Sequence, residues 1–163
     1  MANVFLSENE QRSAIATNDN IFGAGGDESV ILPSGVSGVT IDSNVERFDS
    51  PANLGDHSFQ VTSAGIKISV GGNVVATVPS VAEAGLDLRA ADGNVTVTQT
   101  GVEEFTLANP DDENDSAPVG TDTVAGSDLS ITPGDDTSES GGVETGGGDT
   151  GGGETGDETG DDT

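Results

Sequence analysis

Cysteine, tryptophan and tyrosine are absent from this sequence of 163 residues, and it has a single histidine and a single methionine. Without cysteine the chain can form neither disulfides nor thiolate metal sites. With one imidazole it has little of the side-chain chemistry on which most nucleophilic and acid–base enzymes depend. These absences favour a protein that is not an enzyme.

Basic residues are even scarcer than aromatic ones. Four Lys and Arg residues stand against 30 Asp and Glu residues, which gives a formal net charge of -26. Binding to phosphates needs clustered cations, and the four bases are scattered: Arg12, Arg47, Lys67 and Arg89. The composition excludes nucleic acid as a partner. It favours calcium ions, cell-surface components, or further copies of this chain once ions screen the repulsion.

Long apolar runs are also missing. The segment Met1–Leu6 gives way at once to polar residues, which is short of the ~7–15 apolar residues of a signal-peptide core. No segment approaches the ~18 apolar residues of a spanning helix, so the sequence predicts no membrane insertion. We expect an extracellular or cell-surface location without a visible amino-terminal signal, for which type I secretion is one route.

The composition changes near Pro110. Residues 1–110 hold 14 acidic and 4 basic residues, whereas residues 111–163 hold 16 acidic residues and no basic one. From Gly134 onward, repeats of an acid, Thr and Gly contain Val143 as the one larger apolar residue, too little to bury a core. The sequence predicts a β-rich folded module over 1–110, a transition segment over 111–133 and a disordered acidic tail over 134–163. An edge strand is expected at 124–125 or 129–131.

Within the predicted module, apolar side chains recur at every second position, the pattern of half-buried strands. The expected strands lie at 30–32, 39–41, 45–48, 58–62, 66–70, 74–78, 86–88, 95–98 and 105–107. Gly65, Gly71-Gly72-Asn73 and Asp92-Gly93-Asn94 supply turns between them. Only residues 81–84 and the segment after Leu6 have a composition that allows a helical turn. The fold class is therefore all-β.

The stretch from Asn18 to Val30 is the most suggestive of metal binding. Asp19 and Glu28 lie nine positions apart in a glycine-rich segment, as in the calcium-binding nonapeptide repeat, in which glycines expose carbonyls and an Asp adds its carboxylate. The candidate calcium ligands are Asp19, Gly23, Gly25, Asp27 and Glu28. The match is degenerate, and the alternative is a plain glycine-rich turn before a strand.

Several segments resemble the bacterial hemolysin-type calcium-binding (RTX) secreted proteins and adhesins. They are the Asn18-Asp19-x-Ile21-x-Gly23 stretch, residues 39–48 with Val45-Glu46-Arg47, and Leu88-Arg89-Ala90-Ala91-Asp92-Gly93 with residues 102–105. The resemblance implies a β-roll or β-solenoid with hairpin insertions, calcium-assisted folding outside the cell, and type I secretion. A small β-sandwich is the alternative fold. Ala90 departs from the family pattern, which usually has an aromatic residue there.

Asp56-His57-Ser58 contains the three residue types of a hydrolase triad. Neighbouring residues of a strand face opposite ways, so the three cannot converge, and an exposed turn is the better interpretation.

The sequence as a whole predicts a non-catalytic extracellular structural or adhesive module with calcium-assisted folding. The alternative is a self-assembling structural subunit of a filament, surface layer or virion, and a polysaccharide-active enzyme ranks third.

Overall fold

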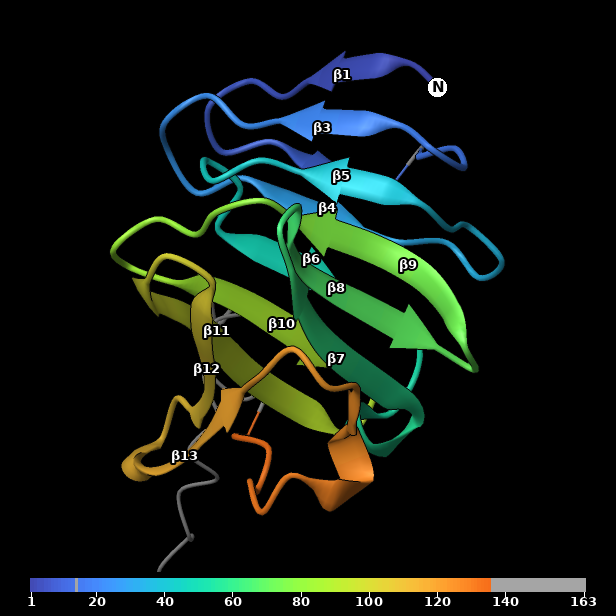
Figure 1. Cartoon of the computed structure of the whole chain (residues 1–163). Coiled ribbons are helices and arrows are strands. Elements are labelled where there is room, and N and C mark those ends of the chain that lie inside the picture. Colours follow the sequence, from blue (N-terminus) through green and yellow to red (C-terminus); the bar gives the residue numbers. More distant parts are fainter. Residues whose placement is uncertain (14, 136–163) are drawn as a thin grey trace, which may run out of the picture.

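The computed structural model describes residues 1–13 and 15–135, apart from the side chain of Glu113. Most of the predicted tail, 136–163, lies outside these residues. The described part of the chain is β-rich and has no α-helix (Figure 1). Its strands form two mixed seven-stranded sheets, and neither closes into a barrel.

The first sheet, sheet A, has the order β1 (Asn3–Phe5), β3 (Asn20–Phe22), β5 (Val39–Ile41), β9 (Asn73–Val78), β8 (Gly65–Val70), β7 (His57–Thr62) and β14 (Val124–Ala125). The second, sheet B, has the order β13 (Asp112–Val119), β12 (Glu104–Asn109), β11 (Gly93–Gly101), β10 (Leu86–Ala90), β6 (Arg47–Asp49), β4 (Ser29–Ile31) and β2 (Gln11–Arg12). Two short 3-10 helices, Leu54–Asp56 and Gly126–Asp128, complete the described elements.

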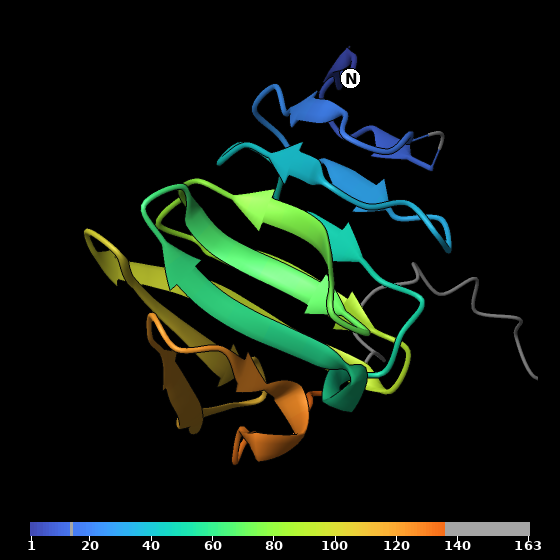
Figure 2. The ribbon, with the colours of Figure 1, turned by 45° about the vertical axis from the view of Figure 1, so that its right-hand side comes forward.

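The amino-terminal half alternates between the sheets. Two consecutive strands, one in sheet A and the next in sheet B, form one turn of the chain, which we call a coil. The four coils are β1 and β2, β3 and β4, β5 and β6, and β9 and β10. Strands of successive coils pair in parallel in both sheets. In sheet B the register pairs Gln11 with Ser29 and Ser29 with Arg47, so successive coils are equally long there. Figures 1 and 2 show the first three coils stacked above the longer strands.

The carboxyl-terminal half consists of antiparallel hairpins. The strands β7, β8 and β9 form a meander in sheet A, and β10 to β13 form another in sheet B. The turns lie at 63–64, 71–72 and 91–92, so the prediction holds for Gly71, Gly72 and Asp92, whereas Gly65, Asn73, Gly93 and Asn94 already belong to the strands that follow. Gly71 and Gly72 connect β8 to β9 with φ of 58° and 82°, values that suit a two-residue hairpin turn and that glycine adopts without strain.

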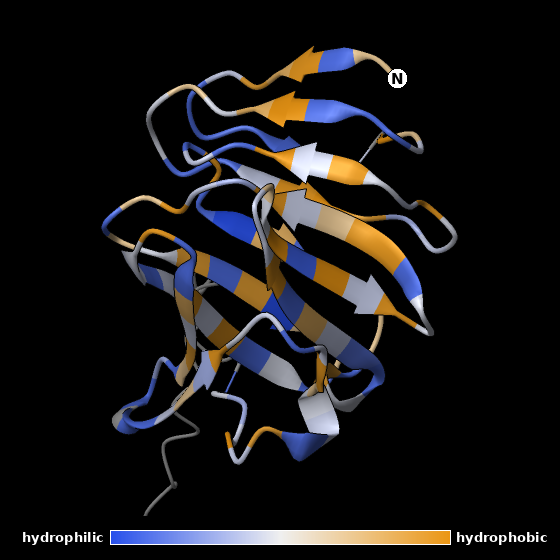
Figure 3. Ribbon diagram, in the orientation of Figure 1, coloured by the Kyte–Doolittle hydropathy of each residue, from blue (hydrophilic) through white to orange (hydrophobic). Residues whose placement is uncertain are grey.

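A single hydrophobic core lies between the sheets. Ile21 and Ile41 of sheet A and Val30 and Phe48 of sheet B are at most 1% exposed. Because the side-chain period of a strand is two, the other positions face water. Figure 3 shows the resulting alternation of hydrophobic and hydrophilic bands along the longer strands.

The structure confirms the all-β class and corrects several local expectations. The segment after Leu6 does not form a helical turn: it contains a turn and then β2. Residues 81–84 also lack a helix. In the first segment, tertiary contacts override the local preference. Gln11 and Arg12 pair with the neighbouring coil through backbone hydrogen bonds, which do not depend on the type of side chain.

Residues 111–133 are tied into both sheets. The strand β13 pairs with β12 along the edge of sheet B, and β14 pairs with β7 as the expected edge strand at Val124–Ala125. Leu129 and Ile131 lie in the core without forming a strand. The division at residue 110 stays a prediction, but the packed unit that the structure describes continues past it.

Candidate functional site

Four of the five predicted calcium ligands, Gly23, Gly25, Asp27 and Glu28, lie where the second coil turns from β3 into β4, whereas Asp19 lies at the other end of β3. Asp19 precedes β3 and is 5% exposed. Its Oδ1 accepts a hydrogen bond from the backbone N–H of Ala2 (2.8 Å) and its Oδ2 from that of Ala16 (3.0 Å). These bonds, first the one from Ala16 and then the one from Ala2, lower the pKa of Asp19. The carboxylate thus ties the first coil to the second.

Gly23 has a packing role. Its N–H donates to Oδ1 of Asp42 (3.0 Å), and a Cβ at this position would collide with the backbone carbonyl of Asn44 in the next coil. Gly25 is exposed and has open space around it. The glycine at position 23 is therefore required by the close approach of two coils, whereas the one at position 25 is not.

Asp27 and Glu28 are neighbours with opposite surroundings. The Asp27 side chain is not buried, and its backbone N–H donates to the Asn9 side chain at 3.1 Å. Glu28 is 0% exposed. Its Oε1 accepts a hydrogen bond from the N–H of Asn9 at 3.2 Å, while its Oε2 is buried without a hydrogen-bond partner. Of the five predicted ligands, Glu28 is the one with an oxygen that is both buried and free.

Glu46 is a second carboxylate at this place, which the prediction missed. Its Oε2 accepts a hydrogen bond from the Glu28 backbone N–H at 2.7 Å. Burial raises the pKa of Glu46 against the lowering effect of the Glu28 N–H, and the Glu28 carboxylate beside it raises that pKa further. Glu10, Glu28 and Glu46 recur at equal intervals along the chain, and this spacing was the sequence signal that could have found Glu46.

The predicted ligands do not gather into one shell. Residues 1–13 and 15–135 contain no group of three or more His, Cys, Asp or Glu side chains that could hold a metal ion. A calcium cage built wholly from side chains is thus not preformed in the described part of the chain. The five-residue assignment stays a prediction, and the carboxylate pair Glu28 and Glu46 is the part with a geometric basis.

His57 does not pair with Ser58, and the expected exposed turn is wrong for it. The imidazole begins β7 and is 1% exposed, with Nδ1 2.7 Å from the carbonyl oxygen of Asn53 and Nε2 2.8 Å from Oγ of Ser50. Because a carbonyl can only accept, Nδ1 carries the proton and Nε2 accepts from the Ser50 hydroxyl. Burial lowers the pKa of His57, which keeps the ring neutral. Sequence reasoning missed Ser50, because the contact depends on how the third coil ends.

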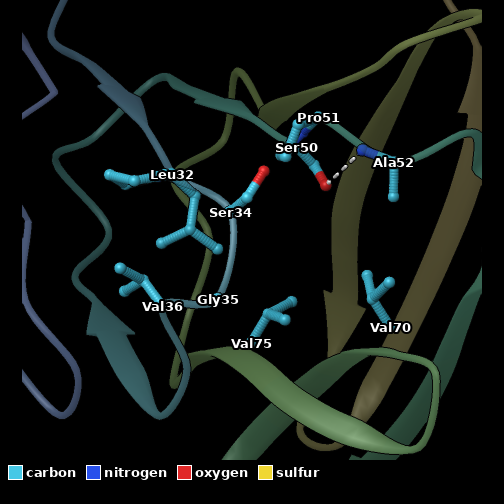
Figure 4. A pocket seen from close by; sticks show the side chains of 10 residues that line it. Leu32, Ser34, Gly35, Val36, Ser50, Pro51, Ala52, Val70 and Val75 are labelled. Atoms are coloured by element: carbon cyan, nitrogen blue, oxygen red, sulfur yellow. Dashed lines mark hydrogen bonds between the residues drawn. The ribbon is translucent and has the colours of Figure 1, made fainter.

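Ser50 also borders a shallow pocket of about 240 Å³. Its walls include Leu32, Val36, Val70 and Val75, and the Ser50 hydroxyl accepts a 3.4 Å hydrogen bond from the Ala52 N–H (Figure 4). None of the residues that line it is charged. Ser50 itself is 6% exposed, so we assign its contact with the buried imidazole to the stability of the junction between coils and hairpins.

Comparisons with known proteins add no family assignment. No protein-family model, no curated protein and no solved structure matches this chain. Among the described residues, no helix is long and apolar enough to cross a membrane.

Proposed function

We propose that this protein is a non-catalytic extracellular structural or adhesive module, with the fold of a β-roll carrying hairpin insertions, and that calcium assists its folding. The observation that carries the proposal is the stack of coils joined by carboxylates, in which the buried Glu28 keeps a free oxygen. The parallel pairing of β1, β3, β5 and β9 agrees with a β-roll. It also agrees with the resemblance of residues 18–108 to hemolysin-type proteins.

Acidic side chains serve as structural links between coils. Asp19 holds the first coil, Asp42 accepts from Gly23 of the second, and Glu46 accepts from Glu28. The four bases are far too few to balance the 30 acidic residues of the chain. Most of the negative charge is therefore left for dissolved cations to screen.

An extracellular setting would supply the cations that screen this negative charge. Calcium sites of extracellular modules have dissociation constants of about 10⁻⁴–10⁻³ M, so weak sites are filled at millimolar calcium. A ligand that binds only the folded state raises its stability. In this proposal the chain is secreted unfolded, by type I secretion, and folds when it meets calcium outside the cell.

The test is thermal unfolding by far-UV circular dichroism, in chelator and in millimolar Ca²⁺, with Mg²⁺ as the control. We expect a higher melting temperature or a stronger β signal with Ca²⁺ than with Mg²⁺. An identical unfolding curve in chelator and in Ca²⁺ would refute calcium-assisted folding.

A self-assembling structural subunit is the second candidate, and the exposed edges of the first coil favour it. In the described structure β1 pairs only with β3, and β2 pairs only with β4. Met1 and Phe5 are 90% and 71% exposed on the first coil. Unpaired strand edges can template further strands. Light scattering after size-exclusion chromatography, with and without Ca²⁺, separates the two: a binding module stays monomeric, whereas a subunit grows in mass with concentration.

A further inference from the structure

Glu10, Glu28 and Glu46 occupy the same place on three successive coils. The backbone ladder of sheet B reaches each of them: Ser29 N–H donates to the carbonyl of Glu10 (3.0 Å), Arg47 N–H to that of Glu28 (3.2 Å) and Asp87 N–H to that of Glu46 (2.8 Å). Neighbouring strands lie ~4.8 Å apart. The three residues therefore form a column along the stack, and in the fourth coil the buried Leu86 succeeds Glu46.

The column is unevenly neutralised. Oε1 of Glu10 pairs with Arg12 at 3.2 Å, and its Oε2 accepts from the Ser7 N–H. The salt bridges of the described residues include neither Glu28 nor Glu46. The hydrogen bonds that these two carboxylates accept come from backbone N–H groups. In the first coil the carboxylate of Glu10 is thus neutralised by an arginine. In the second and third coils the carboxylates of Glu28 and Glu46 are bound by uncharged backbone N–H groups.

The pair Glu28 and Glu46 lies where charge is costly. Glu28 is fully buried and its Oε2 has no partner, and Glu46 is only partly exposed. A buried carboxylate is tolerated when it is paired with a cation or coordinates a metal. The arginines on the neighbouring strands form salt bridges with other carboxylates, Arg12 with Glu10 and Arg47 with Asp49, and Asp27 adds a negative charge in the same turn.

We propose that Glu28 and Glu46 together bind one divalent cation, Ca²⁺, which joins the second coil to the third. The free Oε2 of Glu28 and the carboxylate of Glu46 are its protein ligands, and water reaches it from the exposed side of Glu46. This inference rests on the proposed calcium-assisted folding and assigns the ion to a specific pair. Asp19, Gly23, Gly25 and Asp27 are not ligands in it.

Two carboxylates with water completing the shell make a weak site. Affinity for Ca²⁺ follows the number of charged ligands and the rigidity of the site, so a dissociation constant of about 10⁻⁴–10⁻³ M is expected. At ~10 mM Ca²⁺ the site is ten- to a hundredfold above that constant, which should raise the melting temperature by ~5–10 °C.

The deciding experiment compares Glu28→Gln with Asp27→Asn, which removes the same charge one position away outside the core. The wild type and Asp27→Asn should both melt higher in Ca²⁺. Glu28→Gln should show no shift, and in chelator it should melt above the wild type. The reason is that the new amide keeps the acceptor for Asn9 and removes the repulsion from the Glu46 carboxylate. A purely structural Glu28 would instead give a variant that is weaker in both buffers.

Glu46→Gln provides the reciprocal variant if Glu28→Gln does not fold. It should also lose the calcium shift, and equilibrium dialysis should find about one Ca²⁺ fewer per chain than in the wild type. A calcium shift that persists in both glutamine variants overturns this site and leaves calcium-assisted folding intact. A wild type that ignores Ca²⁺ but is stabilised by mild acid overturns both, and shows that a proton rather than a metal sits between the carboxylates.

Discussion

The coils of residues 3–49 and the hairpins of residues 57–119 bury one core by different means. Strands of these coils are short, two or three residues, whereas those of the hairpins have five to nine. Short strands offer few ladder hydrogen bonds, and the coils supplement them with carboxylates that accept from the backbone of the neighbouring coil, as Asp19 and Glu46 do. In the hairpins each long strand pairs with a neighbour in sequence. Their carboxylates bind segments outside the ladder, as Asp92 does with the Leu54 N–H and Asp115 with the Thr132 N–H.

The two halves also differ in where acidic side chains are buried, since Asp19 and Glu28, the buried acids of the described residues, both lie in the coils. In the coils the acids at positions 19, 28, 42 and 46 hold backbone groups. In the hairpins Asp92, Asp111 and Asp115 also accept hydrogen bonds from backbone N–H groups, but none of the three is buried. The buried positions there are mostly apolar, as at Phe59 and Leu88. We therefore expect cations to act chiefly on the coil half, and the predictions below test how the two halves are stabilised.

The largest effect should come from truncating the core of the coils. Phe48 is 0% exposed on β6, between β4 and β10, and Phe48→Ala should lower the free energy of unfolding by about 3–5 kcal/mol through a cavity. Phe5→Ala is the matched control, because Phe5 is 71% exposed and stacks on Phe22 at the edge of sheet A. Its cost should stay below ~1 kcal/mol. Urea unfolding measures both, and equal losses would mean that the coils are not held by this core.

A smaller effect is expected at the junction between the halves. Ser50→Ala leaves Nε2 of the buried His57 without its hydrogen-bond donor, which should cost about 1–3 kcal/mol. Ser58→Ala, beside His57 on β7, should be nearly neutral. If the two variants unfold at the same urea concentration, the Ser50–His57 contact does not join coils to hairpins.

The pH dependence of that junction should be the smallest effect. Burial lowers the pKa of His57 in the folded state below the ~6.5 of the unfolded chain. Unfolding therefore takes up a proton in mild acid. The stability that neutral His57 provides is complete above about pH 6.5 and is lost as the pH falls below it. We expect the free energy of unfolding to fall more between about pH 7.5 and 5.5 in the wild type than in His57→Gln. Parallel pH profiles would contradict this assignment.

Strands with a strong alternating pattern were predictable, and strands defined by their neighbours were not. Residues 58–62, 66–70 and 74–78 fall within β7, β8 and β9 because each has its own apolar face. The strands β1, β2 and β3 were missed: β1 and β3 are as long as the predicted β5, but none of the three has its two apolar residues around a polar one. They form because an adjacent coil offers backbone partners in register. The polar strand β13 was missed for the same reason, since β12 supplies its ladder.

The residues of the candidate site also divide into those that the sequence predicted and those that only the fold brings together. Glu28 was predicted as a ligand from the glycine-rich spacing, but Glu46 and Ser50 were not singled out, since nothing local distinguishes a carboxylate or hydroxyl that tertiary packing will enclose. The regular spacing of Glu10, Glu28 and Glu46 becomes meaningful once the register of sheet B shows that it equals the length of one coil.

The sequence by itself determined the all-β class, the hairpin turns and the acidic, cysteine-free chemistry, because these follow from side-chain period, glycine positions and composition. The tertiary structure alone decided which coil lies on which, and therefore which carboxylates meet. Parallel pairing joins residues that are far apart in the chain, and the partner across such a gap is set by how the whole chain packs, not by the residues beside it.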